Sequence, residues 1–97
     1  MKVFLSHPMS GLSQTDVLHI RLQAYDHLQE KYGDIELIDN YNHENVPEDA
    51  GRLWHLGASI QQMGQADAIY FCPGWMSANG CQIEHEICKL YELRVLK

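Results

Sequence analysis

The sequence predicts an α/β fold built on a four-stranded parallel sheet. Short apolar runs of strand length alternate with stretches of helical periodicity along the whole chain. The run "DAIYFC", residues 67–72, is almost continuously apolar, which is typical of a parallel strand covered on both faces. No linker, repeat or low-complexity tract divides the chain, so we expect one domain over residues 1–97.

The first half of the chain predicts a strand, a helix and a second strand. The apolar run 2–6 ends in polar loop residues, as a buried strand would. Ser13 is a good helix N-cap, Asp16 completes a capping-box pattern, and Gly33 is a C-terminal stop signal. The second strand is expected at 35–39. The helix between them has apolar residues at helical spacing: Val17, Ile20, Ala24 and Leu28.

The second half continues the alternation after a polar loop at 40–51. A second helix precedes the strand at 67–72, a third spans about 80–91, and 93–97 closes as a fourth strand. We expect the second helix to present one apolar face made of Leu53, Leu56, Ile60 and Met63. We expect the third to face inward through Ile83, Ile87, Leu90 and Tyr91.

This element order favours right-handed crossovers and the strand order 2-1-3-4, a three-layer flavodoxin-like or Rossmann-like arrangement. In such sheets, ligands bind beyond the carboxyl ends of the strands, where the winding direction reverses. That point lies between the first and third strands. Loops 7–13 and 73–80 flank it, so we expect a binding site there.

Composition narrows the function classes. The chain has 97 residues and a net charge of −6, and its seven Lys and Arg residues are scattered, so we do not expect it to bind nucleic acid. The opening residues 1–8 do not resemble a signal peptide, and no apolar run reaches membrane-spanning length. Three cysteines without framework spacing favour a reducing cytoplasm. We therefore expect a cytoplasmic protein without a membrane partner.

The first loop has residues suited to phosphate or sugar hydroxyls. Ser6, Ser10 and Ser13 supply hydroxyls, Gly11 supplies flexibility, and the following helix start supplies free amides. The loop lacks both G-x-G-x-x-G and the Walker lysine, so the dinucleotide and nucleoside-triphosphate fingerprints are absent. The alternative is that these serines only cap a turn.

The second loop leads into the most chemically suggestive helix. Asn79 can N-cap it, with Gln82 reaching back, and Gly80 allows a ligand close to the backbone. Glu84 falls on the second turn near one edge of the apolar face, where its carboxylate can point along a pocket floor. Glu86 projects to the opposite edge, so the two do not form a pair. The alternative for Glu84 is an ordinary solvated residue.

Cys81, His85 and Cys88 share one stripe of this helix and raise the question of a metal. Zinc sites draw tetrahedral ligands from more than one element, and no C-x-x-C or H-x-x-x-H pair completes this set. We therefore expect no metal and assign the stripe to packing or surface. A helix start would lower the pKa of Cys81, but no base beside it is evident for a nucleophilic role.

Three segments carry a family resemblance: 1–12, 53–75 and 80–95. They resemble a small family of unknown function, found in phages and bacteria, within the nucleoside 2-deoxyribosyltransferase-like superfamily. Its characterised members have a flavodoxin-like fold and cleave the N-glycosidic bond of deoxynucleosides or deoxynucleotides. They use a glutamate four residues after a glycine, a spacing matched here by Gly80 and Glu84. The resemblance also implies a homo-oligomer in which a neighbouring subunit closes the pocket.

On this resemblance, Glu84 attacks C1′ and forms a glycosyl-enzyme intermediate, which water hydrolyses or a second base intercepts. Active relatives have an aspartate eight residues before the position of Asp67, where this chain has Ser59, a poor general acid. His7 and His85 are alternative proton donors. We interpret Asp67 as part of a helix–strand junction and consider base contacts less favoured than packing for Tyr70 and Trp75.

The resulting hypothesis is a nucleoside- or nucleotide-binding protein, acting as an N-glycosidase or deoxyribosyltransferase without a cofactor. The alternative is a non-catalytic binder that sequesters a nucleotide-derived metabolite. The loop 40–51, with Tyr41, Asn42 and His43, is either a lid or simply solvated. Glu84 is the candidate catalytic residue, and the candidate substrate-binding residues are Ser6, Pro8, Ser10, Gly11, Ser59, Trp75, Ser77 and Gly80.

Overall fold

The computed structural model describes residues 1–39 and 45–97, and within them four parallel strands form one sheet in the order β2-β1-β3-β4. The predicted fold class and strand order are confirmed. The elements are β1 (Lys2–Ser6), α1 (Gln14–Tyr32), β2 (Glu36–Leu37), α2 (Arg52–Met63), β3 (Ala68–Phe71), a 3-10 helix η1 (Trp75–Ser77), α3 (Asn79–Leu90) and β4 (Val95–Leu96).

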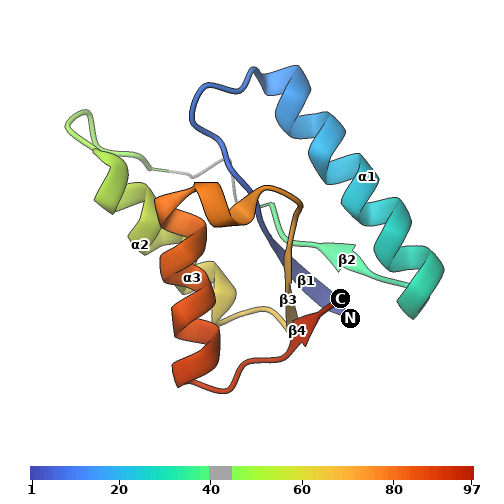
Figure 1. The fold of residues 1–97 in the computed structure, drawn as a ribbon. Helices are drawn as coiled ribbons and strands as arrows, with labels where there is room; N and C mark the ends of the chain where they lie inside the picture. Colours follow the sequence, from blue (N-terminus) through green and yellow to red (C-terminus); the bar gives the residue numbers. More distant parts are fainter. Residues whose placement is uncertain (40–44) are drawn as a thin grey trace.

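The sheet lies between two helical layers, with α1 on one face and α2 and α3 on the other (Figure 1). Side chains of β1 alternate between these faces, as the two-residue period of a strand requires. Val3 and Leu5 pack in the cluster that contains Leu28 of α1. Phe4 packs in the opposite cluster with Cys88 of α3. The same alternation directs the side chain of Ser6, the last residue of β1, toward the α2–α3 layer.

The central pair β1–β3 is the longest, running in register from Val3↔Ala68 to Ser6↔Phe71. The two edge strands are shorter than their apolar runs predict, with β2 and β4 each reduced to two residues. An edge strand pairs on one side alone, so fewer ladder hydrogen bonds hold its ends in extended geometry. The longest-paired part of the sheet, its centre, is therefore the part that leads into the predicted site.

Both end signals of α1 are confirmed. The Ser13 hydroxyl accepts a hydrogen bond from the Asp16 amide, and the Asp16 carboxylate accepts one from the Ser13 amide, each at 3.1 Å. Gly33 ends the helix at φ 83°, a left-handed conformation that favours glycine. The capping box fixes where the loop after β1 must end.

The predicted inward face of α3 is wrong in three of four positions. Ile83, Leu90 and Tyr91 are 44%, 71% and 75% exposed. Ile87 does pack against the core, but the buried stripe of the helix consists of Cys81, Glu84 and Cys88. The helix is rotated relative to its apolar pattern because two thiols and one hydrogen-bonded carboxyl occupy the layer against β1.

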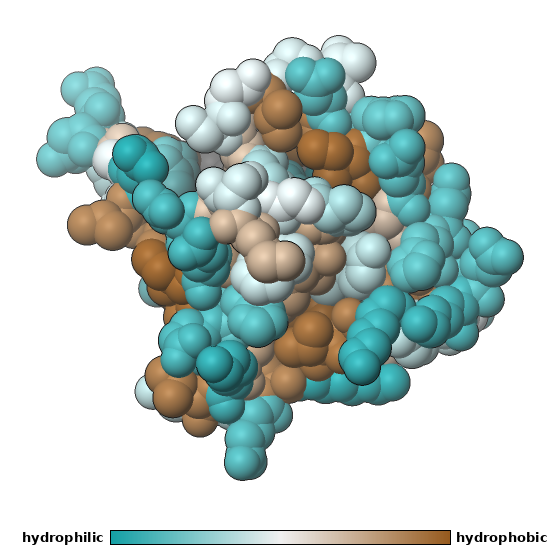
Figure 2. Space-filling view, in the orientation of Figure 1, coloured by the Kyte–Doolittle hydropathy of each residue, from teal (hydrophilic) through white to brown (hydrophobic). Residues whose placement is uncertain are grey.

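The predicted capping of α3 and part of the predicted face of α2 are also wrong. Ala78 is the N-cap of α3 and makes no side-chain capping bond, while Gln82 donates to the Met76 carbonyl of η1 instead. On α2, Met63 is buried but Leu53 is 80% exposed. Figure 2 shows hydrophobic surface interspersed with hydrophilic surface on the side of the molecule where α2 and α3 lie. No helix among the described residues is both long and apolar enough to cross a bilayer.

Replacing the N-cap of α1 tests how this helix start is held. Ser13→Ala removes the hydroxyl that accepts from the Asp16 amide, so we expect the free energy of unfolding to fall by about 1 kcal/mol. Ser13→Asp supplies another acceptor and should recover most of the loss. Urea denaturation of the three proteins measures this. Equal stability of wild type and Ser13→Ala would contradict the capping assignment.

Candidate functional site

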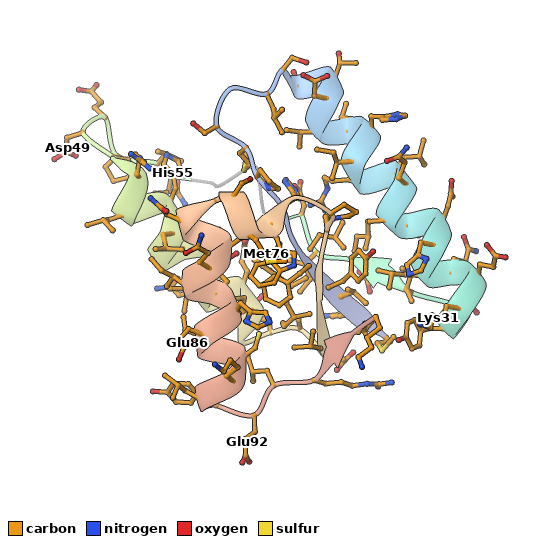
Figure 3. All side chains as sticks on the ribbon, in the orientation of Figure 1. Lys31, Asp49, His55, Met76, Glu86 and Glu92 are labelled. Atoms are coloured by element: carbon orange, nitrogen blue, oxygen red, sulfur yellow. The ribbon has the colours of Figure 1, made fainter. Side chains whose placement is uncertain are left out.

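A cleft of about 990 Å³ opens beside the carboxyl ends of β1 and β3, at the predicted switch point. The loop after β1, α2 from Arg52 to Ser59, the end of η1 and the start of α3 form its walls. Figure 3 shows His55 on α2, on the side that faces α3. The polar residues that line the cleft are His7, Ser10, Arg52, His55, Ser59, Ser77, Asn79 and Glu84.

Glu84 is the acidic group of the cleft wall, although it is only 6% exposed. Its Oε1 accepts a hydrogen bond from the Ser6 hydroxyl at 2.7 Å. Burial raises the pKa of the Glu84 carboxyl to about 7, and the Ser6 hydrogen bond opposes that rise. Both protonation states are therefore populated near neutral pH, which suits a group that exchanges protons or attacks a carbon.

Ser6 is 1% exposed and is not part of the cleft lining. Its hydroxyl points instead to Glu84, because β1 presents Phe4 and Ser6 to the same layer of helices. The structure therefore brings Ser6 to the site from behind the carboxyl. A ligand in the cleft would meet Glu84 before it met this serine.

The buried thiols are protonated groups. Burial raises the pKa of Cys81, which lines the cleft, and the negative charge of Glu84 raises it further. The expected lowering of this pKa at a helix start is wrong, because desolvation outweighs the effect of the amides. Burial also raises the pKa of Cys88 to about 11 and that of Cys72 to about 12. These residues behave as small packing side chains.

His7 lines the cleft but is fixed in its neutral form. Its Nε2 lies 3.4 Å from Nη1 of Arg21, and because a guanidinium can only donate, Nε2 must be the acceptor. Its Nδ1 then carries the proton and donates to the Pro8 carbonyl at 3.1 Å. Burial and the Arg21 charge lower the pKa of His7, against the effect of that carbonyl. His7 is therefore poorly suited to give a proton to a ligand.

Arg21 is a residue that sequence reasoning missed. It lies on the buried side of α1 at 8% exposure, and its Nη2 donates to the Ile38 carbonyl at 2.8 Å. It thereby links α1 to the end of β2 and fixes the His7 ring beside the cleft. The available signal was an arginine at a position that continues the apolar period of the helix, four residues after Val17.

Trp75 and His85 form an aromatic stack outside the cleft lining. Their ring centroids are 4.4 Å apart at 18°, and the Phe71 ring packs edge-on against His85 at 4.9 Å. Asp67 lies at the opposite end of the sheet, where its carboxylate accepts from the Lys2 amide at 2.7 Å. Tyr70 faces His27 of α1. The predicted residues Trp75, His85, Asp67 and Tyr70 therefore do not line the cleft with Glu84.

Six of the nine candidate residues line the cleft: Pro8, Ser10, Ser59, Ser77, Gly80 and Glu84. Gly11 lies in the turn before α1 at φ 78°, and Ser6 and Trp75 lie where described above. Arg52 and His55 were missed, although their spacing to Ser59 places all three near one face of a helix. Tyr41, Asn42 and His43 lie outside the described residues, so the lid hypothesis remains a prediction.

In the part of the chain that the structure describes, no group of three His, Cys, Asp or Glu side chains is arranged to hold a metal ion. Glu86, the second glutamate of α3, points away from the sheet and pairs with Lys89 at 3.6 Å (Figure 3). The group of the site best suited to take part in a reaction is therefore the buried carboxyl of Glu84. The cleft beside it has hydroxyl, imidazole and guanidinium groups.

Comparison with known families adds one finding. The family model "Domain of unknown function (DUF4406)" matches residues 1–97. The chain belongs to this family. The cleft and the buried Glu84 therefore lie within a DUF4406 domain. No curated protein and no solved structure matches the chain.

The raised pKa of Glu84 leads to a prediction about how stability depends on pH. Because the pKa of Glu84 rises from 4.5 to about 7 on folding, the folded state holds its proton longer, and stability should fall as the pH rises through that window. We expect Glu84→Gln to remove this fall and to be more stable at pH 8, by up to about 3 kcal/mol. Urea titrations between pH 4 and 8 measure the difference.

Glu86→Gln is the matched control, because it changes an exposed glutamate on the same helix. Its stability should depend on pH as that of the wild type does. Parallel pH profiles for the wild type and Glu84→Gln would contradict the raised pKa.

Proposed function

We propose that this DUF4406 domain binds a nucleoside or nucleotide in the cleft and cleaves or transfers its N-glycosidic bond through Glu84. The observation that carries the proposal is the position of one carboxyl. Glu84 Oε1 is held by Ser6, while Oε2 has no hydrogen-bond partner among the described residues and is not sealed from solvent. Because Glu84 belongs to the cleft wall, Oε2 is available to a ligand.

The sequence resemblance supports the choice of substrate. Gly80 and Glu84 match the spacing of the catalytic glutamate in the nucleoside 2-deoxyribosyltransferase-like superfamily, and both line the cleft. We therefore propose deoxynucleosides or their monophosphates as the substrate class. The hydroxyls of Ser10 and Ser59 can bind sugar hydroxyls or phosphate oxygens. The Ser77 hydroxyl donates its proton to the Gly74 carbonyl and can accept from a sugar hydroxyl.

In the proposed reaction, ionised Glu84 attacks C1′ of the sugar and forms a glycosyl ester. The bond from C1′ to the base breaks, and its electron pair leaves with the base, which takes up a proton. Water then hydrolyses the ester in the N-glycosidase reaction, whereas a second base displaces Glu84 in the transferase reaction. Near neutral pH, enough Glu84 is ionised for the first step.

The departing base needs a proton, and the position of the superfamily aspartate is occupied by Ser59. His7 is neutral with both ring nitrogens engaged, and His85 is stacked on Trp75 outside the lining. His55 also lines the cleft, one helical turn before Ser59. We assign the donor role to His55 in this proposal.

Base release tests the proposal directly. We expect the purified protein to free the base from at least one member of a panel of deoxynucleosides and deoxynucleoside monophosphates, measured by chromatography. Glu84→Gln should lower the rate at least 100-fold, since it removes the nucleophile. Glu86→Gln should retain the wild-type rate. Equal rates for wild type and Glu84→Gln would show that another group, or a contaminant, releases the base.

A second candidate is a non-catalytic binder of a nucleotide-derived metabolite. Ser59 favours it, because a site without the second carboxylate can still hold a sugar and a phosphate. This candidate predicts that nucleotides raise the melting temperature without turnover, and that Ser10→Ala weakens the effect. Stabilisation together with base release would support the enzyme, and no stabilisation by any nucleotide would count against both.

A further inference from the structure

We propose that Ser6 is a positioning residue, whose hydroxyl holds Oε1 of Glu84 so that Oε2 is the oxygen presented to a ligand in the cleft. This inference rests on the proposed function for its catalytic consequence. It assigns Ser6 a different role from the direct substrate contact that the first loop suggested. The contact itself is a property of the folded chain and can be measured without a substrate.

The backbone pairing of β1 fixes the direction in which the Ser6 side chain points. Ser6 ends β1 in register with Phe71, and the Cys72 amide donates to the Ser6 carbonyl at 2.9 Å. These pairings fix the strand up to its last residue. Strand alternation then places the serine side chain on the α2–α3 side, where Glu84 is the buried polar residue of α3.

The hydrogen bond divides the carboxyl into two unequal oxygens. A serine hydroxyl has one proton, and at 2.7 Å the Ser6 proton is committed to Glu84 Oε1. A bond of this kind to a carboxylate is charge-assisted and is stronger than one between neutral groups. Rotation of the carboxyl would break it in a buried environment. Oε2 is therefore the oxygen that remains on the cleft side.

The surroundings of Glu84 make Ser6 its main favourable partner. On its own helix, Cys81 and Cys88 are thiols whose pKa values are raised, so they are neutral near pH 7. From the loop after β1, His7 is neutral. From the first half of α2, His55 faces the same cleft. Burial raises the pKa of Glu84, and the Ser6 hydroxyl is the contact that lowers it.

Cys81 adds a second neighbour to the serine. Burial and the charge of Glu84 raise the pKa of the Cys81 thiol, whereas the Ser6 side chain lowers it. The thiol is therefore a neutral neighbour of the Ser6–Glu84 hydrogen bond.

The test compares two substitutions, each of which removes one heavy atom from a buried side chain. The two positions lie next to each other where β1 and β3 end. Ser6→Ala removes the hydroxyl, and Cys72→Ala, at 0% exposure beside it, removes a sulfur that does not bind Glu84. Carbon-13 NMR of glutamate-labelled protein gives the pKa of the Glu84 carboxyl, whose signal is identified by its loss in Glu84→Gln. Both truncations should lower the melting temperature.

We expect Ser6→Ala alone to raise the pKa of Glu84, by about one unit, because the carboxylate loses its donor. Ser6→Thr keeps a hydroxyl in a strand that suits β-branched residues, and it should restore the wild-type value. In base release, Ser6→Ala should lower kcat about tenfold with little change in KM. The acidic limb of its pH profile should move by the amount seen in NMR.

The outcomes separate this inference from the proposed function. If Ser6→Ala leaves the pKa of Glu84 unchanged, or Cys72→Ala shifts it equally, the positioning role is overturned even if base release is observed. If the wild type releases no base but the pKa shifts in Ser6→Ala alone, the Ser6 contact is supported and the proposed reaction fails. If Ser6→Ala shifts the pKa but keeps the wild-type kcat, the positioning role is overturned.

Discussion

The hydrogen bond between Ser6 and Glu84 is the constraint on which the candidate site depends. It joins the first strand to the last helix across 78 residues of sequence. Burying a carboxylate without a donor costs several kcal/mol, and the Ser6 hydroxyl offsets part of that cost where α3 turns Glu84 toward the sheet. The same helix rotation buries Glu84 together with Cys81 and Cys88 and leaves Ile83 exposed.

The fold could be predicted because its signals are local and repeat along the chain. The alternation of strand and helix patterns fixes a parallel sheet, and the handedness of crossovers leaves few strand orders. Ser13, Asp16 and Gly33 determine the ends of α1 through neighbours a few residues away. The location of the cleft then follows from topology, since the carboxyl ends of β1 and β3 must meet where the winding reverses.

The inner arrangement of the site could not be predicted, because it depends on pairs that are distant in sequence. An apolar pattern placed Ile83 inside and treated Glu84 as a residue at the edge of that face, whereas long-range pairing decided the reverse. The neutral form of His7 depends on its burial and on Arg21, which lies 14 residues later on another element. Neither contact produces a residue spacing that can be recognised in a single sequence.

The buried carboxyl itself requires an explanation beyond packing. A structural role would be served at lower cost by a neutral amide, which can accept the same hydrogen bond from Ser6 without a charge to desolvate. A purely structural carboxylate would also be expected to have both oxygens engaged, yet in the described residues only Oε1 of Glu84 has a partner. Burial of the charge is destabilising above the raised pKa. Carboxyls whose pKa is raised by burial and that line a cleft are typical of functional sites, and this is the physical support for the role proposed for Glu84.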